Sequence, residues 1–104
     1  MKRLILFVLL FGSAAAENPI VSACTAKNLY VKASAAGGQA TSGKVELYKN
    51  GSASGLTCTL GTGTTCNDTT HTVALTTSDV WSVRITTAQT GDTTGNPRVT
   101  FQCQ

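Results

Sequence analysis

Apolar and polar residues alternate along most of the chain beyond residue 44, and this period of two constrains the fold more than any other feature. Val45 and Leu47 alternate with polar neighbours, and the same pattern recurs in segments 56–60, 73–76, 81–86 and 99–103. Such a period places successive side chains on opposite faces of a strand. The 3.6-residue period of an amphipathic helix is almost absent, so the sequence predicts an all-β fold.

Turn signals separate these segments. Asn50-Gly51 predicts a type I′ hairpin turn, which needs positive φ at both central residues. Segments 20–26 and 29–34 are further predicted strands, and the low-complexity stretch 35–43 and the segment 91–97 are predicted loops. Six or seven short strands predict a single small antiparallel β-sandwich, jelly-roll or Ig-like in type, with both sheets contributing to one core.

The first sixteen residues have a different composition from the rest. Residues 4–11 form an unbroken apolar run, preceded by Lys2 and Arg3 and followed by the small residues 12–16. A basic start, a short apolar run and a small-residue cleavage site are typical of a secretory signal peptide. Eight strongly apolar residues fall far short of the roughly 20 that a spanning helix needs. We therefore predict a signal peptide over 1–16, a β-sandwich domain over 17–104, and a secreted protein.

The chain contains four cysteines, Cys24, Cys58, Cys66 and Cys103, all within the predicted exported part. An even number of cysteines in an oxidising compartment favours disulfides, and none has the C-x-x-C spacing typical of zinc sites. Four cysteines permit three connectivities. Spacing favours Cys58 with Cys66, and Cys24 with Cys103 near the two ends of the predicted domain. Small domains with a modest core often need this covalent support.

Charge limits the classes of partner. Without residues 1–16 the chain keeps six Lys and Arg against five Asp and Glu, a net charge of +1. Nucleic acids and anionic lipid surfaces are bound largely through clustered positive charge. We expect no nucleic-acid partner, and no membrane partner once the signal peptide is removed.

Part of the chain, residues 44–103, also resembles a known group of proteins. The resemblance rests on Leu47-Tyr48-Lys49-Asn50-Gly51, on the segments around Cys58 and Cys66, and on Val80-Trp81-Ser82-Val83-Arg84-Ile85. These patterns are similar to small disulfide-containing β-sandwich domains of bacterial and phage surface proteins. The resemblance implies the fold and the pairing of Cys58 with Cys66, but no activity.

Catalytic chemistry has few candidate groups. His71 is the only imidazole that could serve as a general base, and its parity with Val73 at a strand entrance favours a structural histidine. The acidic residues Asp68, Asp79 and Asp92 lie in turn or loop contexts, where aspartate usually accepts hydrogen bonds from backbone N–H groups. No D-x-D-x-D-G calcium loop is present. We predict no enzyme activity, no metal site and no cofactor.

The sequence supports ligand binding more than catalysis. The candidate ligand-binding residues are Tyr30, Tyr48, Asn67 and Asp92. Trp81 lies on an inward row, whereas both tyrosines alternate outward. An exposed tyrosine can stack on a sugar ring and hydrogen-bond through its hydroxyl. Asn50-Gly51-Ser52 and Asn67-Asp68-Thr69 also match the glycosylation acceptor pattern.

The sequence is compatible with three functions. The favoured one is a secreted, non-enzymatic module with a structural, adhesive or surface-assembly role, whose edge strands self-associate or pair with other proteins. The second is an extracellular carbohydrate-binding module. The third is a small secreted inhibitor or effector that acts through the loop closed by Cys58 and Cys66.

Overall fold

The computed structural model describes residues 5–10, 17–86 and 94–104. Within these ranges the chain forms strands and no helix, which confirms the all-β prediction. The strands are β1 (Ile5–Leu10), β2 (Asn18–Pro19), β3 (Cys24–Lys32), β4 (Lys44–Lys49), β5 (Ser52–Thr59), β6 (Thr65–Asp68), β7 (Val73–Leu75), β8 (Val80–Thr86) and β9 (Arg98–Cys103). In these same ranges no helix is long and apolar enough to cross a membrane.

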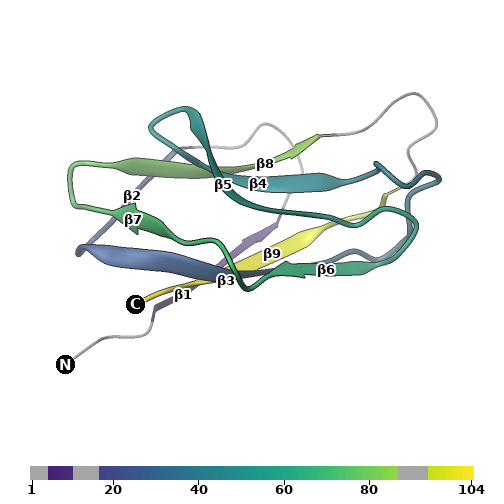
Figure 1. Cartoon of the computed structure of the whole chain (residues 1–104), viewed down its shortest axis with the longest axis horizontal. Coiled ribbons are helices and arrows are strands. Elements are labelled where there is room, and N and C mark those ends of the chain that lie inside the picture. The colour runs from purple at the N-terminus through teal and green to yellow at the C-terminus, as the bar shows by residue number, and fades with distance from the viewer. Residues whose placement is uncertain (1–4, 11–16, 87–93) are drawn as a thin grey trace.

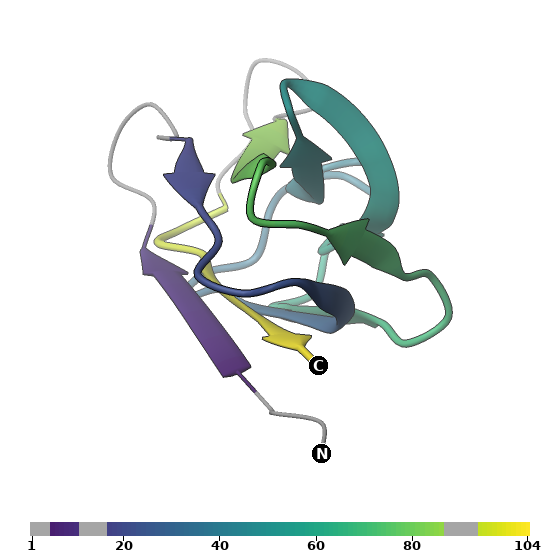
Figure 2. The ribbon, with the colours of Figure 1, turned by 90° about the vertical axis from the view of Figure 1, so that its left-hand side faces the viewer.

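The strands form two antiparallel sheets. One has the order β1-β9-β3-β6, with β7 also paired to β3, and the other has the order β2-β8-β4-β5. Figure 1 shows β8, β4 and β5 on one side of the molecule and β3, β9 and β6 on the other. Seen along the long axis, β1 and β5 lie on opposite sides (Figure 2).

Both sheets contribute their inward rows to one apolar cluster. Fully buried members include Leu29 and Val31 from β3 and Leu47 and Val83 from the other sheet. Trp81 on β8 meets Phe101 on β9 edge-to-face, with ring centroids 5.1 Å apart. Such aromatic pairs contribute about 0.5–1.5 kcal/mol beyond their buried area. The alternation in the sequence therefore marks the core correctly on these strands.

Both predicted disulfides are present, Cys24 with Cys103 and Cys58 with Cys66. Their Cα atoms lie 5.3 and 5.8 Å apart, within the usual range for a disulfide. The first bridge joins β3 to β9 in one sheet, whereas the second joins β5 to β6 and thus links one sheet to the other. The two bridges are compatible with an oxidising extracellular environment.

The predicted turn at Asn50-Gly51 is also confirmed. The φ angles of these residues are 52° and 82°, and they connect β4 to β5. Positive φ at both positions is what a type I′ turn requires, and asparagine and glycine adopt it at least cost.

Segments 20–26 and 29–34 were predicted as two strands, and that division is wrong. A single strand, β3, runs from Cys24 to Lys32, with a shift in its register to β9 between Lys27 and Tyr30. Ala26 and Leu29 are both fully buried although they are three residues apart. The bulge at Asn28, which has φ 55°, absorbs the extra residue and keeps both side chains inward.

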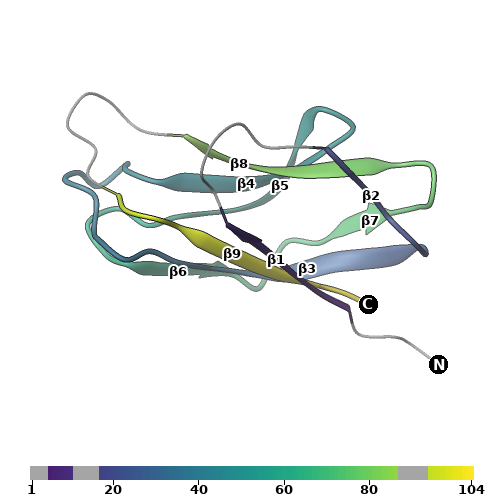
Figure 3. The same ribbon diagram turned by 180° about the vertical axis from the view of Figure 1, so that it is seen from behind.

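The polar segment Thr65–Asp68 was not predicted as a strand, because it has no apolar alternation. It forms β6 by pairing with β3 at the edge of the sheet. The apolar segment Ile5–Leu10 lies within the predicted signal peptide and pairs with β9 as strand β1 (Figure 3). This arrangement belongs to the uncleaved chain, and removal of residues 1–16 stays a prediction.

Candidate functional site

The outer face of the sheet β9-β3-β6 carries an exposed tyrosine. Leu29 and Val31 are fully buried, so Tyr30 between them faces outward and keeps 44% of its surface exposed. It lies directly opposite Asn67 on β6 and Thr100 on β9. Directly opposed residues share a face of the sheet and are close enough to contact one ligand. The structure therefore brings together two of the four predicted ligand-binding residues, Tyr30 and Asn67.

The next outward row contains two cations. Lys32, two residues beyond Tyr30 on β3, pairs with Arg98 on β9 and with Thr65 on β6. Lys32 and Arg98 also line a groove of about 290 Å³, together with Ala33, Ser34 and Asn96. Two cations beside an exposed aromatic ring favour a ligand with both an apolar ring face and negative charge.

Sequence reasoning missed Lys32, Arg98 and Thr100. The alternation of apolar and polar residues in β3 and β9 is enough to predict that these three side chains point outward. Their proximity to Tyr30 could not be predicted in this way, since β3 and β9 are separated by some 70 residues and their pairing depends on the sheet order.

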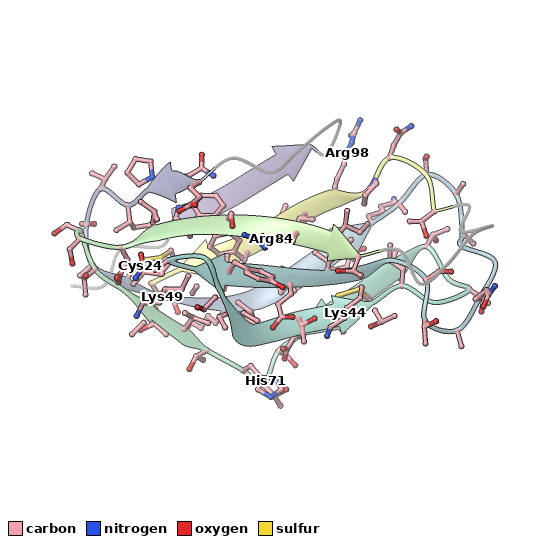
Figure 4. The ribbon with its side chains drawn as sticks, turned by 90° about the horizontal axis from the view of Figure 1, so that it is seen from above. Cys24, Lys44, Lys49, His71, Arg84 and Arg98 are labelled. Atoms are coloured by element: carbon pink, nitrogen blue, oxygen red, sulfur yellow. A yellow bond between two sulfur atoms is a disulfide. The ribbon has the colours of Figure 1, made fainter. Side chains whose placement is uncertain are left out.

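The other two predicted ligand-binding residues do not join this face. Tyr48 lies on the outer face of the second sheet, half-buried beneath Arg84, whose guanidinium carbon is 4.2 Å from the ring centroid. Figure 4 shows Arg84 on this second sheet, with Arg98 and His71 at opposite margins of the view. Asp92 lies outside the described residues. The predicted set therefore does not form a single site.

Asp68 forms the densest polar cluster on the described part of the chain. Its side chain is 5% exposed. One carboxylate oxygen accepts hydrogen bonds from the backbone N–H groups of Thr70 and His71 and from the Thr70 hydroxyl, at 3.0, 3.1 and 3.0 Å. The other accepts from the Thr57 N–H at 3.1 Å and contacts His71 Nδ1 at 2.8 Å. The predicted structural role of this aspartate is confirmed.

The pKa of Asp68 reflects this environment. Burial alone would raise the pKa, because it disfavours the charged carboxylate. The N–H donors of His71, Thr57 and Thr70, with a smaller contribution from the His71 side chain, outweigh burial and hold the pKa well below its usual range. The carboxylate is therefore charged and fully engaged, which leaves it little capacity to act as an acid or base.

The His71 side chain contacts Asp68 at the surface and is not packed into the apolar core. Its side chain is 63% exposed, and the hydrogen bond of its imidazole recorded in the structure is with Asp68. A catalytic histidine would also need a nucleophile within hydrogen-bonding distance, and the hydrogen bonds of the described residues contain no such partner for His71. Among the same residues, no group of three or more His, Cys, Asp or Glu side chains is arranged to hold a metal ion.

A second polar cluster stabilises the turns at the other end of the strands. Asn50 donates to Asp79 at 2.8 Å and accepts from the Val80 N–H at 2.9 Å, while Asp79 accepts from the Thr76 N–H at 2.8 Å. The Asn50 side chain, the Thr76 backbone and the nearby Lys49 lower the pKa of Asp79 to about 2. This cluster is structural as well, and it occupies the amide nitrogen that glycosylation of Asn50 would modify.

Comparisons with known proteins give no further guide to this site. No family model, no curated protein and no solved structure matches the chain.

Proposed function

We propose that this chain is an exported, non-enzymatic β-sandwich module with a structural or adhesive role in assembling an extracellular surface. In this proposal residues 1–16 direct export and are removed, and the two sheets pack face to face around the shared core. The apolar cluster drawn from both sheets supports the sandwich arrangement, and the two disulfides fit the oxidising compartment that export implies.

The observation that carries the proposal is the difference in how the edge strands are protected. Edge strands expose unpaired backbone groups and are usually blunted against association. On β5 the N–H of Thr57 is occupied by the carboxylate of Asp68, which belongs to the other sheet, and the N–H of Gly55 is occupied by the carboxylate of Glu46 on the neighbouring β4, both at 3.1 Å. The short β2 contains Pro19, which has no N–H to offer. The long regular edge of β9 is instead covered by β1, the segment predicted to leave.

The difference between the β9 edge and the protected β5 and β2 edges favours a chain that assembles with other chains over one that acts as a monomer. The chain has devices that block two edges but leaves the β9 edge to a removable segment. An assembly module needs a regular open edge for pairing, and the protection of the β5 and β2 edges limits indiscriminate aggregation.

The test is to express the full chain in a secreting host, fractionate the culture, and measure the intact mass of the product. We expect a mass that starts at Glu17 with both disulfides formed, and labelling of the chain outside the cell. A product that keeps residues 1–16 inside the cell with four free thiols would overturn the proposal.

A second candidate, an extracellular carbohydrate-binding module, is favoured by the pairing of Tyr30 with Asn67. Lys32 and Arg98 in the next row direct this candidate toward acidic sugars. Binding of the secreted chain to an array of neutral and acidic glycans provides the test. Tyr30→Ala should abolish binding, whereas Tyr48→Ala on the opposite sheet is the matched control and should retain it. If the wild-type chain binds no glycan on the array, or if both variants lose binding equally, this function is contradicted.

A further inference from the structure

The β9 edge is built to accept a full-length antiparallel strand. β1 pairs with β9 over six consecutive residues, from Ile5 opposite Cys103 to Leu10 opposite Arg98, without a register shift. The pairings of β3 with β9 and of β4 with β5 each contain a shift. A regular six-residue register leaves an evenly spaced row of donors and acceptors, which is the best template for another strand.

The β9 strand itself has few of the features that protect an edge. Arg98–Cys103 contains no proline, glycine or lysine, and its one charged residue is at the start of the strand. Val99, Phe101 and Cys103 are buried, so the inward row is already fixed by the core. Without β1, roughly three residues of β9 would present both N–H and C=O groups to solvent.

We infer that removal of residues 1–16 opens the β9 edge, and that the mature chain then dimerises by antiparallel pairing of β9 with β9 of a second copy. This inference rests on the proposed function, because export is what removes the leader. In the dimer the sheets containing β9 become one continuous sheet across a two-fold axis.

The second copy is the occupant that geometry favours. A two-fold axis perpendicular to the sheet makes the two β9 strands antiparallel, which is the direction in which β1 already pairs. Opposed residues must share a face, so the axis passes at a residue, and the axes that keep most of β9 paired pass at Thr100 or at Phe101. In either case Arg98 lies opposite a glutamine, Gln102 or Gln104, and not opposite its own copy. The net charge of +1 adds little repulsion between copies.

The experiment uses the secreted, processed protein, whose intact mass shows whether residues 1–16 have been removed. Light scattering coupled to size exclusion is measured from about 10 µM to about 1 mM, the range in which a small interface becomes populated. Hydrogen exchange of the 98–103 amides is followed over the same range. We expect a monomer–dimer equilibrium, with protection of these amides increasing as the dimer forms.

Two matched variants test the surface directly. Thr100→Lys places like charges opposite or diagonal to each other at the two-fold axis, so it should weaken the dimer at least about threefold. Thr59→Lys, at an exposed position of the blunted β5 edge, is the control and should leave the dimer unchanged. Hydrogen exchange of the other strands shows whether each variant remains folded.

The outcomes separate this inference from the proposed function. A processed chain that stays monomeric, forms an open-ended series of oligomers, or dimerises without protecting 98–103 overturns the β9 pairing and leaves the export proposal standing. A secreted product that retains residues 1–16 overturns both.

Discussion

Replacement of Asp68 is the sharpest test of how the two sheets are held together at the β5–β6 side. The carboxylate links three segments, because it accepts from Thr57 on β5 and from Thr70 and His71 in the turn after β6. Asp68→Ala removes every one of these bonds. Asp68→Asn keeps the size of the side chain but replaces one oxygen with an NH₂ group.

The magnitude follows from which donors water can reach. Thr70 and His71 are exposed, so in the variant their N–H groups can donate to water in place of the carboxylate, with little loss of stability. The N–H of Thr57 is more shielded, and a hydrogen bond to a charged group contributes about 1.5–3 kcal/mol. We expect Asp68→Ala to lower the free energy of unfolding by about 3 kcal/mol and Asp68→Asn by about 2 kcal/mol, since a single amide oxygen cannot accept from both the Thr57 N–H and the N–H groups of the turn.

Urea unfolding of the disulfide-intact protein at neutral pH measures both values. Acid adds a second signature. A carboxyl whose pKa is lower in the folded state stabilises the fold above its unfolded pKa of about 4, and this contribution is lost as the pH falls through the folded value. Wild type should therefore lose more stability than Asp68→Asn between about pH 5 and pH 2. A neutral-pH loss below about 0.5 kcal/mol for Asp68→Ala, or parallel acid profiles, would refute the reasoning.

Other expected outcomes concern separate elements. Replacing Cys58 and Cys66 together with alanine should lower the free energy of unfolding by about 2.6 kcal/mol, from the chain entropy of a nine-residue loop, and urea unfolding measures it. Asn50→Gly preserves positive φ but removes the hydrogen bonds to Asp79 and to the Val80 N–H at the start of β8, so we expect a loss of about 1–2 kcal/mol in the free energy of unfolding, whereas no change would show the bonds to be dispensable. Arg84→Ala removes a cation–π contact that is worth about 0.5–1 kcal/mol at an exposed site, and Arg84→Lys in thermal unfolding should retain part of it.

Local pattern was sufficient for much of the fold. Alternation identified the strands around Val45, Val83 and Phe101 together with their inward faces, because a strand's period of two is a property of consecutive residues. The Asn50-Gly51 turn was equally local, since two residues that tolerate positive φ determine it. The pairing of the cysteines followed from their spacing.

Where the prediction was wrong, longer-range pairing was the reason. The bulge at Asn28 joins what the alternation presents as two strands, and the polar β6 is a strand only because β3 supplies its hydrogen bonds. The candidate ligand-binding set separated for the same reason. Tyr30 and Asn67 are opposed across β3 and β6, while Tyr48 belongs to the other sheet.

The sequence by itself determined the fold class, the inward rows and the apolar character of residues 4–11, all of which depend on neighbouring residues or on composition. Cysteine spacing also favoured the disulfide partners that the structure contains. Only the tertiary structure decided that Lys32 and Arg98 lie in the row next to Tyr30, that Asp68 occupies the Thr57 N–H on the β5 edge, and that residues 5–10 lie along β9. Sheet order sets these relations, and it depends on which strands pair across the chain rather than on the pattern within any one of them.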